Sequence, residues 1–171
     1  MSATSFAPCI AIVGPGEFAT DGVVADAEET GRLVAARGWT VLLGGRDAGV
    51  MRAAARGARE RGGIVVGLLP GRDRTDAAPD LTVALATGLG EARNAVIATA
   101  ADAVVACGTS AGTASEVALA IRAGRPTVLV RPTPEAAAFF AGLAERSRFT
   151  VVGSPEEAMT WVARALGRDT G

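Results

Sequence analysis

The chain has 171 residues, of which 49% are hydrophobic, and its formal net charge at pH 7 is -1. We expect residues 1–171 to form a single soluble domain with a substantial core. The nearly neutral charge argues against nucleic-acid binding, and no apolar run approaches the roughly 20 residues that a membrane span requires. No basic segment precedes the first apolar run, so we expect no signal peptide and a cytoplasmic protein.

The residue types that the chain lacks narrow its chemistry. It contains no His, Lys, Tyr or Gln, and all 17 of its basic residues are Arg. The absence of His excludes a Ser-His triad, and the absence of Lys excludes a Schiff base with pyridoxal phosphate. Cys9 and Cys107 lie in or beside expected strands, which favours reduced core thiols over a disulfide or a catalytic thiol. No paired-acid cluster indicates a metal site, and we expect none.

Apolar strand patterns alternate with helical patterns along the chain. The expected elements, in chain order, are strand Cys9–Val13, helix 21–37, strand 39–43, helix 50–61, strand 64–69, strand 81–86, helix 91–101, strand 103–106, helix 113–123, strand 126–130, helix 134–145, strand Phe149–Val152 and helix 155–166. Gly38 closes the first helix, residues 71–80 form a polar loop, and Ser154 starts a capping box with Pro155 at the first helical position. This alternation predicts an α/β fold, a Rossmann-like parallel sheet of about seven strands with helices on both faces.

Glycine clusters follow three of the expected strands. In such sheets ligands bind beyond the carboxyl ends of the strands, so these turns predict one cleft. Segment 108–116 places backbone N–H groups at a helix N-terminus, which suits a phosphate. The first turn does not meet the dinucleotide fingerprint, because it lacks the third Gly and the acidic residue further on. The clusters are Gly14 and Gly16, then Gly44, Gly45 and Gly49, then Gly108 and Gly112.

Several segments together resemble the LOG-type, or lysine-decarboxylase-like, superfamily over roughly residues 8–131. They are similar to its GGGxxGLM, GGxVxGxxP and RK…AD…PGGxGTxxE patterns. The details around Gly88 and Glu116 look closer to a sub-group that includes molybdenum-cofactor carrier proteins. The matching segments are 43–51 (LGGRDAGVM), 62–70 (GGIVVGLLP), Arg93, Ala101-Asp102 and Gly112-Thr113-x-x-Glu116.

The resemblance implies binding of a phosphorylated small molecule. LOG enzymes hydrolyse the N-glycosidic bond of nucleoside 5′-monophosphates, and Arg93 and Glu116 match their catalytic residues. Met51 matches a residue beside the nucleotide, and the phosphate loop maps onto Gly108, Thr109, Ser110, Ala111, Gly112 and Thr113. In this interpretation no cofactor is required, and Arg93 keeps Glu116 ionised by lowering its pKa.

The chain also departs from the LOG pattern. Thr109 and Ser110 replace loop glycines, Asn94 replaces a Lys, and Arg46 replaces a third Gly beside Asp47. These departures, and the sub-group, favour the alternative: a carrier or sensor without turnover, for molybdenum cofactor or a related phosphorylated pterin or nucleotide. The Arg–Glu pair favours the hydrolase.

Simpler interpretations of the same residues stay open. Glu116 is also suited to the first turn of a helix, where the helix dipole favours an acid. Arg93 is compatible with a helix surface, Asn94 and Thr113 with helix starts, and Arg46-Asp47 with an exposed turn. The helices at 94–101 and 117–123 have few polar positions, so we expect a homodimer or higher homo-oligomer.

Overall fold

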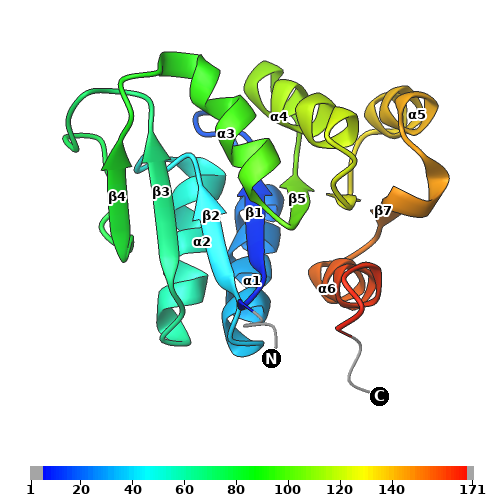
Figure 1. Cartoon of the computed structure of the whole chain (residues 1–171), viewed down its shortest axis with the longest axis horizontal. Helices are drawn as coiled ribbons and strands as arrows, with labels where there is room; N and C mark the ends of the chain where they lie inside the picture. Colours follow the sequence, from blue (N-terminus) through cyan, green and yellow to red (C-terminus); the bar gives the residue numbers. More distant parts are fainter. Residues whose placement is uncertain (1–5, 169–171) are drawn as a thin grey trace, which may run out of the picture.

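A computed structural model describes residues 6–168, and within this range seven strands and six α-helices alternate along the chain. Figure 1 shows them in chain order. They are β1 (Cys9–Val13), α1 (Asp21–Ala36), β2 (Thr40–Leu43), α2 (Gly49–Glu60), β3 (Val65–Leu69), β4 (Val83–Ala86), α3 (Arg93–Ala100), β5 (Ala103–Cys107), α4 (Ala111–Arg122), β6 (Thr127–Val130), α5 (Pro134–Leu143), β7 (Phe149–Val152) and α6 (Pro155–Ala165), with 3-10 turns η1 (Gly90–Ala92) and η2 (Arg146–Arg148).

The strands form one parallel sheet in the order β4-β3-β2-β1-β5-β6-β7. The chain runs outward from β1 to β4 on one side, then returns to β5 on the other side of β1. Ile10 on β1 therefore pairs with Val41 of β2 on one side and with Ala103 of β5 on the other. This reversal between β1 and β5 is the place where such sheets bind ligands. The predicted Rossmann-like fold is confirmed.

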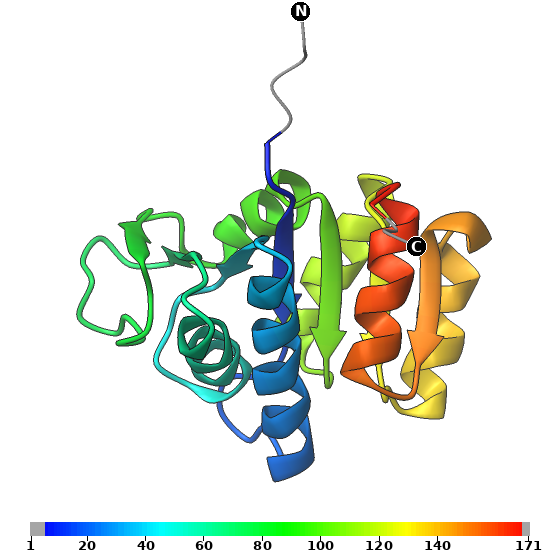
Figure 2. The same cartoon turned by 90° about the horizontal axis from the view of Figure 1, so that it is seen from below.

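Helices cover both faces of the sheet, with α1, α2 and α6 on one face and α3, α4 and α5 on the other (Figures 1 and 2). Successive strand residues point to opposite faces. Ile10 and Ile12 pack into the core beneath α1, α2 and α6, whereas Ala11 and Val13 pack into the core beneath α3, α4 and α5. The strands are continuously apolar because both of their faces are buried.

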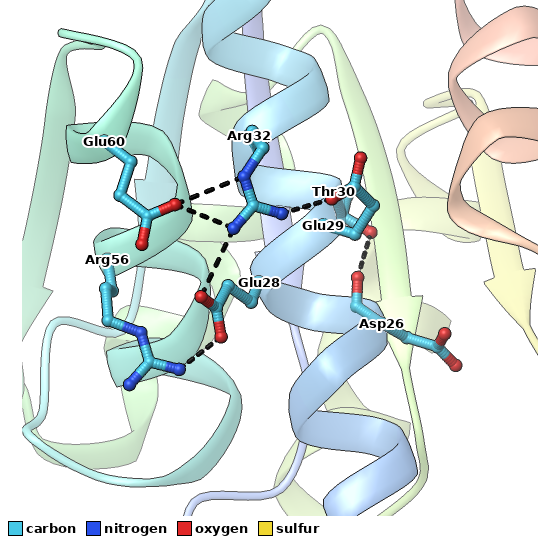
Figure 3. A network of polar contacts seen from close by, with 7 residues as sticks. All are labelled: Asp26, Glu28, Glu29, Thr30, Arg32, Arg56 and Glu60. Carbon is cyan, nitrogen blue, oxygen red and sulfur yellow. Dashed lines mark hydrogen bonds and ion pairs between the residues drawn. The ribbon is translucent and has the colours of Figure 1, made fainter.

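Helices α1 and α2 approach closely at two glycines. A Cβ on Gly31 would lie 2.2 Å from the Ala54 carbonyl oxygen, and one on Gly57 would lie 1.9 Å from that of Glu28. Arg32 of α1 also pairs with Glu60 of α2 at 2.7 Å, within the polar network that Figure 3 shows. Because ion pairs near the surface contribute about 0–1 kcal/mol each, they add only modestly to the close packing at the glycines.

Helix α4 begins at Ala111, two residues before the predicted start. Ser110 has an extended backbone, and its Oγ accepts a hydrogen bond from the Thr113 amide at 3.2 Å. A serine in this geometry is a favourable N-cap, so the helix starts directly after it. The predicted cap at Ser154, with Pro155 at the first helical position, is confirmed.

Candidate ligand-binding site

A cavity of about 340 Å³ opens at the carboxyl ends of β1 and β2, beside the N-terminal ends of α3 and α4. It lies at the reversal of strand order between β1 and β5. Four separate segments of the chain converge on it. Its lining residues are Ile12, Val13, Gly14, Gly16, Glu17, Phe18, Gly44, Arg46, Met51, Glu91, Arg93, Asn94, Ser110, Gly112, Thr113 and Glu116.

Arg93 and Glu116 form a buried ion pair in this cavity. Arg93 Nη1 lies 3.4 Å from Glu116 Oε1, and each side chain is 8% exposed. The same Nη1 donates a hydrogen bond to Asn94 Oδ1. Arg93 Nε is buried and has no hydrogen-bond partner within the part of the chain that the structure describes. A buried, unsatisfied donor costs about 1–3 kcal/mol, and Nε is such an unpaired donor on a residue that lines the cavity.

Gly44, at the end of β2, makes room for the Arg93 guanidinium. A Cβ at this position would lie 2.9 Å from both Arg93 Nη2 and Met51 Sδ. Met51 itself is 8% exposed and contributes to the same wall. The glycine thus brings the guanidinium close to the backbone at the strand end.

Asn94 links α3 to the first turn of α4. Its Nδ2 donates a hydrogen bond to Ser115 Oγ at 3.0 Å, and that hydroxyl donates to the Gly112 carbonyl at 2.7 Å. With its Oδ1 bound to Arg93, Asn94 orients the guanidinium relative to the N-terminus of α4. Ser115 was not predicted, because its role depends on the approach of two helices distant in sequence.

The N-terminus of α4 forms another part of the wall. Ser110 Oγ accepts a hydrogen bond from the Thr113 amide, and it lies 2.8 Å from Thr113 Oγ1. The first amides of an α-helix have no intrahelical partner, and the helix dipole favours an anion there. Gly112 adds open space, since a Cβ on it would meet only Ser110 Oγ within 4 Å, at 3.9 Å. This end of the cavity is suited to a phosphate.

The pKa of Glu116 is raised, whereas the sequence led us to expect a lowered pKa. Its pKa is raised from the ordinary 4.5 to about 7, because burial outweighs the opposing effect of Arg93, and Glu91 raises the pKa further. The expectation that Arg93 holds this carboxyl ionised is therefore wrong in its net direction. A carboxyl with this pKa exchanges a proton near neutral pH.

The structure brings most of the predicted site residues together. The remainder serve the turns around the cavity. Asp47 pairs with Arg52 at 2.6 Å, and a Cβ on Gly49 would lie 2.1 Å from the Gly16 carbonyl oxygen. Gly108, with φ of 74°, packs against Val23. The predicted positions outside the lining are Gly45, Asp47, Gly49, Gly88, Gly108, Thr109 and Ala111.

The β1–α1 loop contributes two lining residues that were not predicted. Phe18 is 95% exposed at a φ of 64°, and Glu17 Oε1 lies 3.9 Å from Arg46 Nη2 at the rim. Glu91, from η1, also lines the cavity. The sequence did carry a signal for Phe18, because it is a large aromatic residue in a turn, residues 14–20, that otherwise consists of small and polar residues.

Within residues 6–168 the structure shows neither a cluster of metal ligands nor a membrane-spanning helix. No set of three or more His, Cys, Asp or Glu side chains there is arranged to hold a metal ion. None of the described helices is long and apolar enough to cross a membrane. Cys9 and Cys107 are both free, and burial raises the pKa of Cys107 to about 12.

Fold and cavity together define a Rossmann-like protein with a small-molecule-sized hollow at the topological switch point. The chain belongs to the SLOG cluster4 family, whose sequence model matches residues 7–159. This confirms the resemblance to the LOG-type superfamily.

Solved structures of two molybdenum-cofactor proteins are similar to this chain. The molybdenum cofactor binding protein of Rippkaea orientalis is 36% identical with a TM-score of 0.90, covering 93% of this chain and 97% of its own. The molybdenum cofactor carrier protein of Chlamydomonas reinhardtii is 37% identical with a TM-score of 0.90, covering 95% and 99%. An uncharacterized protein of Archaeoglobus fulgidus is 36% identical over 124 residues, which are 72% of this chain and 80% of that protein.

Proposed function

We propose that this protein is a carrier for molybdenum cofactor, or for a closely related phosphorylated pterin, and does not convert it. The observation that carries the proposal is the similarity to two molybdenum-cofactor proteins over more than nine-tenths of the chain. The family match over residues 7–159 spans every segment that lines the cavity. Of the two functions considered from the sequence, the comparisons favour the carrier over the hydrolase.

The cavity fits the chemistry of such a cargo. A phosphorylated pterin has an anionic end and a flat polar ring, and its volume suits a site of about 300–1,000 Å³. The 340 Å³ cavity offers the N-terminus of α4 for the phosphate. Arg93, which lines the same cavity, offers a second contact for an oxygen or another anionic group of the cargo.

The second candidate is a nucleoside 5′-monophosphate phosphoribohydrolase, and the Arg93–Glu116 pair favours it. Glycosidic cleavage develops positive charge on the sugar, which an ionised carboxylate stabilises. With a pKa of about 7, Glu116 is ionised in only about half of the molecules at neutral pH. Protonation weakens Glu116 as a fixed negative charge, but a carboxyl that titrates near neutral pH is suited to general acid–base catalysis. The preference for the carrier therefore rests on the comparisons.

The experiment measures binding and turnover on the same preparations. Calorimetry with 6-hydroxymethylpterin monophosphate should show saturable binding, while chromatography after incubation with AMP, GMP, CMP and UMP should show no free base. Arg93→Ala should weaken pterin binding at least tenfold. Arg122→Ala, an exposed arginine at the far end of α4, is the matched control. Base release that disappears in Glu116→Gln would establish the hydrolase instead.

We also propose that the protein self-associates through the face formed by η1, α3 and α4. Leu89 is 51% exposed and Val96 40% exposed on this side. A cavity between α3 and the N-terminal half of α4 is lined by the apolar Ala92, Ala95 and Leu119, together with polar residues such as Asn94 and Ser115. Burying these apolar side chains against a second copy is favourable.

A further inference from the structure

Phe18 has an unusual position for an aromatic residue. Its side chain is 95% exposed, and its φ of 64° lies in the left-handed region, which bulky residues rarely adopt. It therefore contributes no burial to the core and adopts an unfavourable backbone conformation. Phe18 is a large, exposed hydrophobic residue, and it also lines the cavity.

The loop that carries Phe18 is anchored at both ends. On one side the Val50 amide donates to the Pro15 carbonyl at 3.1 Å, which ties the loop to the start of α2. On the other side Thr20 caps α1, accepting from the Val23 amide at 3.4 Å. Phe18 lies between these two hydrogen bonds, which restrain the loop beside the cavity that Phe18 lines.

We infer that Phe18 is the residue on which the flat conjugated ring of the ligand stacks, and that it makes the site selective for phosphorylated ligands with a heteroaromatic ring. The inference rests on the proposed function for the phosphorylated ligand, and it adds the ring contact. The N-terminus of α4 supplies an anion-binding end to the same cavity. Stacking of a ligand ring on Phe18 covers the exposed aromatic face, which no described part of the chain covers.

The test compares ligands with and without a ring. The probes are 6-hydroxymethylpterin monophosphate and GMP, with ribose 5-phosphate as the ring-free compound. Loss of one aromatic stacking partner weakens binding by about 5- to 150-fold. We expect Phe18→Ala to lose this factor for the two ring-bearing probes and to bind ribose 5-phosphate like wild type.

A tryptophan at the same position provides a second readout. Phe18→Trp should retain binding of 6-hydroxymethylpterin monophosphate, and the pterin should quench the emission of the new indole, measured against wild type, which has Trp39 and Trp161. Ribose 5-phosphate should leave that emission unchanged. Phe139→Ala is the matched control, because Phe139 is 61% exposed on α5 and lies outside the cavity lining.

The outcomes separate this inference from the proposed function. Equal affinity for the pterin and GMP, both weakened by Phe18→Ala, would contradict a pterin carrier and support the stacking. Unchanged affinity of folded Phe18→Ala for both ring probes would overturn the stacking and leave the carrier standing. An equal loss for ribose 5-phosphate would also overturn it, since the effect would not depend on a ring. Failure of wild type to bind either ring probe would overturn both.

Discussion

Arg93 Nη1 lies 3.4 Å from Glu116 Oε1 inside a cavity at the switch point of a parallel sheet. Both side chains are almost fully buried, and burial outweighs the arginine in setting the acidity of the carboxyl. When Glu116 is protonated, the pair has a net charge of +1 and favours an anion. When it is ionised, Arg93 is neutralised. The net charge of the pair therefore depends on the protonation of Glu116, whose pKa is raised to about 7.

The first prediction concerns stability against pH. The pKa of Glu116 is raised to about 7 in the folded protein from its ordinary 4.5, by burial and by Glu91, against the effect of Arg93. Folding then favours the protonated form, so its contribution is fully present below about pH 4.5 and is lost as pH rises through about 7. The loss corresponds to roughly 3 kcal/mol.

Urea unfolding of wild type and Glu116→Gln between pH 4.5 and 8 measures this contribution. The glutamine variant cannot ionise, so its stability relative to wild type should rise over that range and level off above pH 7. A constant difference between the two proteins across the range would show that burial does not raise the pKa of Glu116.

The second prediction contrasts two glycines at strand ends. Gly44→Ala places a Cβ 2.9 Å from the flexible ends of Arg93 and Met51, so those side chains move and the fold is kept. We expect at least a tenfold loss of affinity for the pterin phosphate with little change in melting temperature. Gly14→Ala meets the Cys107 carbonyl oxygen at 2.3 Å, and such overpacking costs roughly 1–3 kcal/mol.

Thermal melts and calorimetry on both variants test this contrast. Gly14→Ala serves as the control for a substitution that acts through packing against the backbone. If Gly44→Ala binds like wild type, the position of the Arg93 guanidinium does not determine affinity.

Much of this architecture follows from the pattern of the chain. The continuous apolar strands predicted a parallel sheet, and the glycines after β1 and β2 predicted its ligand-binding edge. Of the clustered glycines, however, Gly14, Gly16, Gly44 and Gly112 line the cavity, while the others serve turns and close packing. Sequence spacing does not separate these two uses, since both require the absence of a side chain.

Other features depend on three-dimensional context. The start of α4 follows from the geometry of the Ser110 cap, and serine also occurs in loops without capping. The raised pKa of Glu116 depends on how deeply two helices bury it, which the neighbouring sequence does not specify. Phe18 gave no periodic signal because it lies in a turn.

The third prediction concerns the backbone at Phe18. The left-handed conformation costs a non-glycine residue roughly 1–2 kcal/mol, and glycine avoids this cost. Glycine also gives the unfolded chain more entropy, which offsets about 0.4–1 kcal/mol of that gain. We therefore expect Phe18→Gly to be more stable than Phe18→Ala by about 0.8 kcal/mol in chemical unfolding, the difference between the midpoints of these two ranges. Both variants should lose the ring contact equally. A less stable glycine variant would be inconsistent with the left-handed backbone.

The fourth prediction concerns self-association. Val96→Asp places a charge on the exposed apolar face of α3 and should convert the oligomer to a monomer in light scattering at micromolar concentration. Val83→Asp is the matched control, because Val83 has a similar exposure, 42%, on edge strand β4. A wild-type monomer would refute self-association. If only Val83→Asp gave a monomer, the interface would lie at the sheet edge and not on α3.

Loading the protein with molybdenum cofactor itself shows whether the cavity carries this cofactor. Cofactor released from a molybdenum enzyme is mixed anaerobically with wild type, Arg93→Ala or Arg122→Ala, and pterin and molybdenum are quantified in the protein fraction after gel filtration. If the protein is a carrier, wild type and Arg122→Ala should each retain about one pterin and one molybdenum per chain, and Arg93→Ala should retain at least tenfold less. Equal and substoichiometric pterin in all three proteins would contradict the carrier function.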